Sequence, residues 1–134
     1  MYVKDYYADI GVRPGTRFDV IVELLGEPKD IVRSVHVDYL ATVIYEGIEF
    51  VVEYGKGATE TGVVSGVRVF SPDIRFGRRQ IGISSTRDEL RRAYRRVGWH
   101  WENDSQMGFT DGITWITFNI NENDQVTRIS LTTF

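Results

Sequence analysis

Apolar residues recur three and four positions apart in two stretches of the chain, 16–26 and 86–98. This spacing places apolar side chains on one face of an α-helix. The residues of these faces are Phe18, Ile21, Leu24 and Leu25 in the first stretch and Leu90, Ala93, Tyr94 and Val97 in the second. We therefore predict an amphipathic helix in each stretch.

The two predicted helices carry similar start and stop signals. A threonine, Thr16 or Thr86, stands where its hydroxyl can accept a hydrogen bond from the first turn of the helix. Thr86 and Glu89 also have the spacing of a capping box. A glycine, Gly26 or Gly98, follows each helix and can adopt the left-handed conformation that ends it. The repetition predicts two copies of one structural unit.

Alternating apolar and polar residues after each helix predict antiparallel strands. Two-residue turns at Glu46-Gly47 and Asp111-Gly112 separate neighbouring runs, as in β-hairpins. The predicted strand regions are 35–39, 42–45, 48–53 and the run around 67–69 in the first unit, and the lead-in at Phe109, 113–120 and 126–134 in the second. The stretch 98–104 between them is expected to be a polar loop.

The strand 113–120 has apolar residues on both of its faces. Either Trp115 or the pair Ile116 and Phe118 faces the core, because a shift of one residue exchanges the two faces. The sequence leaves both registers open.

These elements predict an α+β fold in a single domain over residues 1–134. We expect two tandem helix-plus-antiparallel-hairpin repeats, at about 9–70 and 79–134, that form one extended antiparallel sheet with the helices on one face. A small sheet with one helix is marginally stable alone, so the two units should bury one face of the sheet together. The other face would remain for solvent or a partner.

The first unit resembles the repeat of the beta-lactamase-inhibitor-protein-like fold, which the bacterial SmpA/OmlA outer-membrane lipoproteins share. The resemblance rests on the Ile-Gly lead-in, the helix end Leu25-Gly26-Glu27-Pro28, and a following hairpin with Tyr39, Tyr45, Glu46 and Gly47. The second unit departs from it, with Gly98-Trp99-His100 in place of Gly-Glu-Pro. The resemblance implies a tandem fold whose sheet offers a concave, non-enzymatic protein-binding surface.

The composition excludes several kinds of site. It has 134 residues, a net charge of −3 and no cysteine, which excludes disulfides, thiolate metal ligands and a cysteine nucleophile. A cysteine-free chain suits a reducing compartment. We see neither the apolar core of an export signal nor an apolar run of 18 residues, so we expect a cytoplasmic protein without a membrane segment.

Positive charge is concentrated in one segment. Residues 75–98 hold eight arginines against Asp88 and Glu89, so this segment carries +6 and the remainder of the chain carries −9. Its basic patch is Arg91, Arg92, Arg95 and Arg96. Arginines beside aromatic residues can bind nucleic acid, but Asp88 and Glu89 can also pair with Arg91 and Arg92 at helical spacing. The chain is acidic overall, which argues against nucleic acid.

The sequence offers no complete catalytic or metal-binding constellation. His36 and Asp38 would share one face of a predicted strand, and Glu49 and Glu53 could join them from a neighbouring strand. Two or three such residues are more typical of a solvated polar face than of a site. Nucleotide-binding and nucleophile-elbow motifs are missing as well. We expect no enzyme activity, no cofactor and no metal.

Two surfaces are candidates for binding a partner. Trp99 and Trp101 flank His100, and tryptophan is the residue most enriched among interface anchors, although one indole could instead fold into the core. The outward strand face of the first unit would carry a mixed, mainly acidic set: His36, Asp38, Glu49, Glu53 and Arg68. This set is either a plain solvent face or a surface for a basic protein.

These observations together favour a non-enzymatic protein-binding module, most concretely a small acidic immunity- or inhibitor-type protein of bacteria that occludes a partner protein. One alternative is a small-molecule- or lipid-associated binding module of the same fold. A second is a nucleic-acid-associated protein that uses the arginine-rich helix 87–96. A homodimer through an exposed sheet edge stays open.

Overall fold

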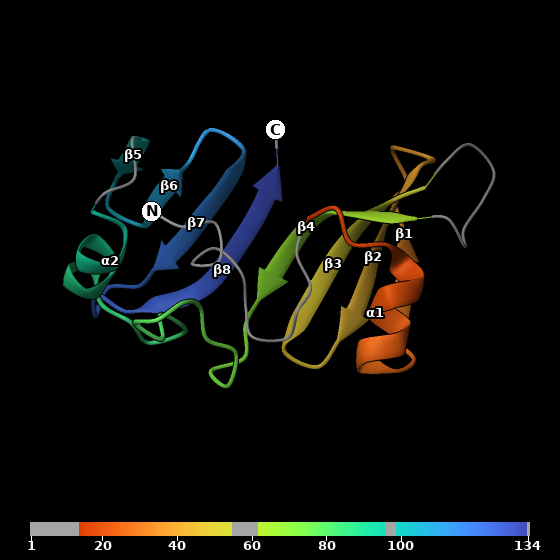
Figure 1. Ribbon diagram of the computed structural model, residues 1–134, viewed down its shortest axis with the longest axis horizontal. Helices are drawn as coiled ribbons and strands as arrows, with labels where there is room; N and C mark the ends of the chain where they lie inside the picture. Colours follow the sequence, from red (N-terminus) through yellow and green to blue (C-terminus); the bar gives the residue numbers. More distant parts are fainter. Residues whose placement is uncertain (1–13, 55–61, 96–98, 134) are drawn as a thin grey trace.

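The computed structural model describes residues 14–54, 62–95 and 99–133 (Figure 1). These residues form two helices, α1 (Phe18–Leu25) and α2 (Arg87–Tyr94), and eight strands. The strands are β1 (Asp30–Arg33), β2 (Leu40–Tyr45), β3 (Ile48–Glu53), β4 (Val63–Val69), β5 (Trp99–Glu102), β6 (Gln106–Thr110), β7 (Thr114–Ile120) and β8 (Val126–Thr133).

All eight strands belong to one antiparallel sheet with the order β1-β2-β3-β4-β8-β7-β6-β5. The chain runs from β1 at one edge to β4 near the centre, then continues at the opposite edge with β5 and returns to β8. Strands β4 and β8 pair and join the two halves, as the middle of Figure 1 shows. The helix α1 lies at the β1–β3 end of the sheet, and α2 lies at the β5–β7 end.

The predicted fold class, an α+β fold of two helix-plus-hairpin repeats, is wrong. The structure is dominated by its eight-stranded sheet, and each helix has only 8 residues. Four consecutive strands follow each helix. The first strand of each set, the edge strand β1 or β5, was not predicted. All residues of these two strands are exposed, so they lack the alternating burial that marks a strand in a sequence.

The stretch 35–39 alternates in sequence but is not a strand. It forms the turn between β1 and β2, in which the backbone N–H groups of His36 and Val37 donate to Ser34 Oγ at 3.2 and 3.1 Å. The polar loop expected at 98–104 instead contains β5, which pairs with β6. The edge strands β1 and β5 have only 4 residues each, all of them exposed, so no alternation of buried and exposed positions identifies either strand.

The helix predictions are confirmed, and α2 begins as expected. Glu89 N–H donates to Thr86 Oγ1 at 3.3 Å, and Thr86 N–H donates to Glu89 Oε1 at 3.1 Å, which completes a capping box. The N-cap of α1 is Arg17 rather than Thr16, and it has no side-chain cap. Gly26 closes α1 with a positive φ of 81°, and its N–H donates to the carbonyl of Val22 at 2.8 Å. Gly98 lies outside the described residues.

The core lies on the side of the sheet that faces the helices. Helix α2 buries Leu90 and Tyr94, and the ring of Tyr94 lies 4.9 Å from that of Phe109 and 5.6 Å from that of Phe118. The connection between β4 and α2 adds Phe76 and Ile81, whose backbones pair with each other. Burial of each such side chain stabilises the fold by roughly 1.5–3 kcal/mol.

The register of β7 answers the question left open by the sequence. Ile116 and Phe118 are completely buried on the helix side, and Trp115 points to the opposite face. Within the described residues, no helix has the length and apolar character needed to span a membrane.

Candidate functional site

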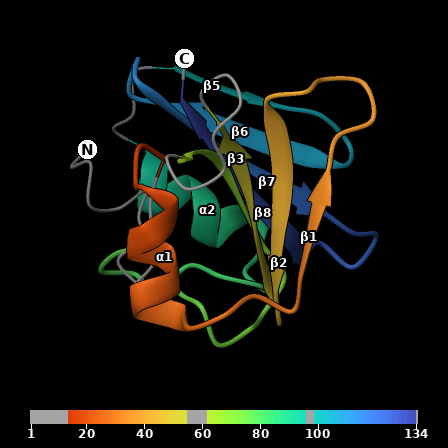
Figure 2. The same cartoon turned by 90° about the vertical axis from the view of Figure 1, so that its right-hand side faces the viewer.

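Both helices lie on the same side of the sheet (Figure 2). Phe18 of α1 contacts Tyr54 just after β3, and Tyr94 of α2 stacks on Phe109 of β6. The strand register places these two contacted residues on one face of the sheet. The opposite face, called here the open face, carries no helix of the described chain.

A row of residues without charge crosses the whole open face. The strand pairings place one residue from each strand side by side: Val32, Thr42, Val51, Gly66, Thr132, Trp115, Thr110 and Trp99. This uncharged row begins at the edge strand β1 and ends at the edge strand β5. Neighbouring strands are about 4.8 Å apart, so eight strands make the row about 34 Å long.

A second row runs beside the first. Its members are Asp30, Ile44, Glu49, Arg68, Ser130, Thr117, Gly108 and Trp101. Two of its charges offset each other, because Arg68 Nε lies 3.4 Å from Glu49 Oε2. Arg68 Nη2 also donates to Thr42 Oγ1 of the uncharged row at 3.4 Å. The middle of the open face is therefore nearly neutral.

All three tryptophans of the chain lie on the open face, toward its β5 edge. The side chain of Trp99 is 74% exposed and that of Trp101 is 37% exposed. Trp115 is half-buried between Thr110 and Thr132. Two strands thus bring the three indoles to one end of the face, which we call the tryptophan end.

The predicted binding residues of 99–101 separate onto two faces. Trp99 and Trp101 share the open face, as their equal parity indicates, whereas His100 points to the helix side. The His100 ring lies 6.4 Å from that of Phe109 in a stacked arrangement. Of these three residues, only Trp99 and Trp101 can contribute to the same binding surface.

Only three of the five residues predicted on the outward strand face of the first unit lie on such a face. Glu49, Glu53 and Arg68 lie on the open face. His36 and Asp38 do not lie on a strand but in the exposed turn after β1, so the expected pairing of these two on one strand face is wrong. The described residues hold no group of three or more histidine and carboxylate side chains that could bind a metal ion.

Part of the basic patch is neutralised within the chain. Arg91 contacts Asp88 and Glu102, both at 3.0 Å, and Arg87 contacts Glu102 at 3.0 Å and Asp124 at 3.1 Å. The hydrogen bond to Glu102 and then its charge raise the pKa of Arg91 above its ordinary value. The side chains of Arg92 and Arg95 are exposed, and Arg96 lies outside the described residues.

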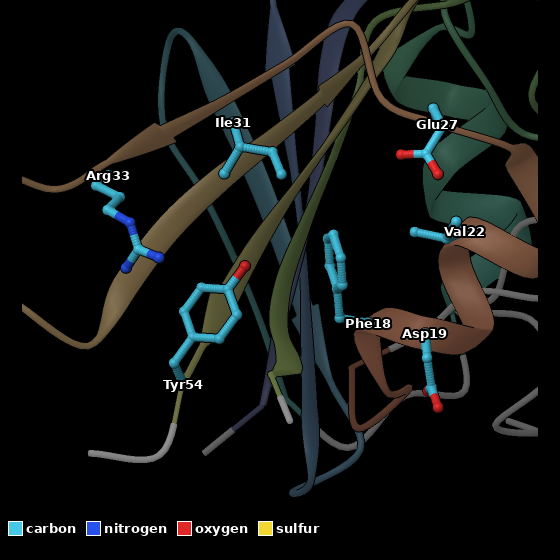
Figure 3. A pocket seen from close by; sticks show the side chains of 7 residues that line it. All are labelled: Phe18, Asp19, Val22, Glu27, Ile31, Arg33 and Tyr54. Carbon is cyan, nitrogen blue, oxygen red and sulfur yellow. The ribbon is translucent and has the colours of Figure 1, made fainter. Parts of the chain in front are cut away.

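A hollow of about 570 Å³ lies on the helix side, between α1 and the β1–β3 end of the sheet (Figure 3). Its lining residues are Phe18, Asp19, Val22, Glu27, Ile31, Arg33 and Tyr54. Sequence reasoning did not find it, because Val22 is outside the predicted apolar stripe and Ile31 and Arg33 belong to the missed strand β1. The sequence signal is weak: an apolar residue, Ile31, and a cation, Arg33, stand two positions apart a few residues after the predicted end of the first helix.

No protein-family model matches the sequence, and no curated protein sequence matches it significantly. Two solved structures resemble its fold. An extracellular protein containing a SCP domain from Bacillus anthracis superposes with a TM-score of 0.64 at 10% identity, over 99% of this chain and 48% of that one. A DUF4309 family protein from Bacillus subtilis gives 0.50 at 14% identity, over 88% and 78%.

The chain thus spans about half the length of the first of these proteins. At such identities the likeness concerns the fold alone. The resemblance to the beta-lactamase-inhibitor-protein-like repeat stays a prediction, as does the expected cytoplasmic location.

Proposed function

We propose that the protein is a non-catalytic binding module that recognises another protein through its open face. The observation that carries this proposal is the tryptophan end, where Trp99 is mostly exposed beside Trp101 on a sheet face that no helix of the described residues covers. An exposed indole leaves a large apolar surface in water. Tryptophan anchors are the residues that most often dominate binding between proteins.

The size of the face favours a macromolecular partner over a small ligand. The uncharged row alone is about 34 Å long, and a standard interface buries about 800 Å² on each partner. A small molecule would contact only a fraction of the row.

The charges on the face indicate the chemistry of the partner. The uncharged row is complementary to a partner surface that is apolar or weakly polar at its centre. Asp30 and Glu53 are exposed toward the β1–β3 end, where a basic rim on the partner would be attracted to them. Such rim charges mainly increase the association rate.

The experiment compares the proteins retained from a native lysate by wild type, Trp99→Ala and Leu24→Ala. Leu24 is the matched control because it is also a large, exposed apolar residue (53%) but belongs to α1, on the other side of the sheet. We expect one partner to be retained by wild type and Leu24→Ala, with Trp99→Ala weakening its binding by about 2 kcal/mol. Retention that is equal in the two variants would refute the proposed surface.

The immunity- or inhibitor-type role expected from the sequence is the finer form of this proposal. A stoichiometric complex in which the partner loses its own activity would support it. A partner that keeps its full activity in the complex would leave a binding role without inhibition.

A further inference from the structure

The hollow beside α1 has the size and the mixed chemistry of a small-molecule site. Its volume of about 570 Å³ falls within the usual range of such pockets, roughly 300–1,000 Å³. Phe18 and Val22 of α1 form one apolar wall, and Ile31 of β1 forms the other. The residue that gives the hollow its polarity is Tyr54.

Tyr54 is only 8% exposed, yet its hydroxyl points into the hollow (Figure 3). This hydroxyl is not among the buried polar atoms without a partner in the described residues, and none of their hydrogen bonds involves it, so it is accessible to solvent in the hollow. Burial raises the pKa of Tyr54, an effect that the charge of Arg33 partly opposes, so the phenol stays protonated at neutral pH and can donate. A hydroxyl that points into the hollow and donates to no described residue is a donor available to a ligand.

Arg33 supplies further donors at the same place. Its guanidinium carbon lies 5.6 Å from the centre of the Tyr54 ring. Among the residues that the structure describes, no carboxylate lies within ion-pair distance of Arg33. Two donor groups therefore meet at the sheet end of the hollow without an acceptor between them.

The two acidic residues of the lining lie at the helix end of the hollow. Asp19 is already held by Arg17, whose Nε and Nη2 donate to its two carboxylate oxygens at 3.1 and 2.8 Å. Glu27 follows α1 and lies toward Tyr45, whose pKa its charge helps to raise. The groups that lack a partner at the sheet end are thus donors, which favours an anion there over a cation.

We propose that this hollow binds a small organic anion with an apolar body, of the aliphatic or aromatic carboxylate class. The anionic group accepts hydrogen bonds from Arg33 and the Tyr54 hydroxyl, and the apolar body packs between Phe18, Val22 and Ile31. This site is on the opposite side of the sheet from the open face, so it does not depend on the proposed protein partner.

The test uses two fluorescent probes of similar shape, the anion 8-anilino-1-naphthalenesulfonate and the neutral N-phenyl-1-naphthylamine. We expect Arg33→Gln to weaken the anionic probe about fivefold, as for the loss of a charge-assisted hydrogen bond near the surface, and to change the neutral probe less than twofold. The matched control is Arg92→Gln, which removes the same charge from the exposed face of α2. It should leave both probes unchanged.

A second variant and a pair of competitors complete the test. Tyr54→Phe keeps the ring and removes only the hydroxyl, so it should weaken the anion about threefold even if Arg33→Gln is poorly folded. Decanoate should displace the anionic probe better than decyltrimethylammonium does.

The binding position is read from amide chemical shifts of the labelled protein. The proposal expects the shifts at Val22, Ile31 and Tyr54. It is overturned if the probe does not bind, if the shifts lie at the tryptophan end, if both arginine variants weaken the anion equally, or if the cation is the better competitor.

Discussion

The indole of Trp101 lies across the backbone of Gly108 on the neighbouring strand. The two residues are paired in register between β5 and β6, and a Cβ placed on Gly108 would overlap three atoms of the indole ring. The absence of a side chain at Gly108 therefore lets the aromatic ring lie flat against the sheet. The tryptophan end depends on this contact for its shape.

Replacing Gly108 by alanine should displace the Trp101 ring into solvent. We expect a red shift of the tryptophan fluorescence and a loss of about 1 kcal/mol of stability from the lost aromatic packing. The control is Gly66→Ala, also on the open face, where a Cβ would meet its neighbours at 3.5–3.6 Å, an ordinary contact. An unchanged emission spectrum in Gly108→Ala would contradict the close packing of the two residues.

The register of β7 predicts unequal effects for two neighbouring aromatic residues. Phe118→Ala should lower the free energy of unfolding by about 3–5 kcal/mol, because this ring is fully buried against Tyr94 and Phe109. Trp115→Ala should cost clearly less, because the indole is half-buried on the open face. Urea denaturation of both variants measures the difference, and the opposite ranking would require the other register.

These two faces of β7 illustrate what sequence reasoning could reach. A period of two identified the strand, but both faces carry apolar residues, so only the pairing with β6 and β8 decides which one is covered. The start of α2 and its buried residues Leu90 and Tyr94 were predictable, since a capping box and an apolar stripe are local signals. Local signals do not reveal which face of a strand is covered by the rest of the chain.

The missed features depend on contacts between distant parts of the chain. Strand β5 is exposed throughout and resembles a polar loop in sequence, so it became recognisable only when paired with β6. The hollow requires α1, β1 and Tyr54 to be placed together, and Tyr54 is 36 positions after Phe18. The alternation at 35–39 misled in the other direction, because the Ser34 hydroxyl holds that stretch in a turn.

Glu102 ties the edge strand β5 to α2, because it accepts from Arg87 and Arg91 at 3.0 Å each. Glu102→Gln should lower the stability by about 0.5–1 kcal/mol at low salt, a modest value because the side chain is partly exposed and screened by water. The difference from wild type should shrink in 1 M salt, where charges are screened within about 3 Å.

The control for this prediction is Glu122→Gln. Glu122 is exposed and forms no ion pair with the described residues, so its loss should not affect stability measurably. Thermal unfolding of both variants at low salt and in 1 M salt measures the two stability differences from wild type. A difference for Glu102→Gln that did not depend on salt would show that the ion pairs contribute nothing.

Tyr45 links β2 to the end of α1 and should make stability depend on pH in the alkaline range. Its hydroxyl donates to the Gly26 carbonyl at 2.6 Å, and burial, followed by the charge of Glu27, raises its pKa above the ordinary value of 10.0. The folded state therefore holds this proton more tightly than the unfolded state does. The stabilisation is complete below about pH 10 and is lost as the pH rises through the raised pKa.

Tyr45→Phe separates this effect from general alkaline unfolding. At pH 7 the variant should lose about 1 kcal/mol, because the Gly26 carbonyl loses its donor. Above pH 10 the gap between wild type and variant should narrow, since only the wild type has this proton to lose. Urea unfolding at pH 7, 9 and 10.5 measures the gap, and a gap that stayed constant would mean that the Tyr45 proton is not linked to folding.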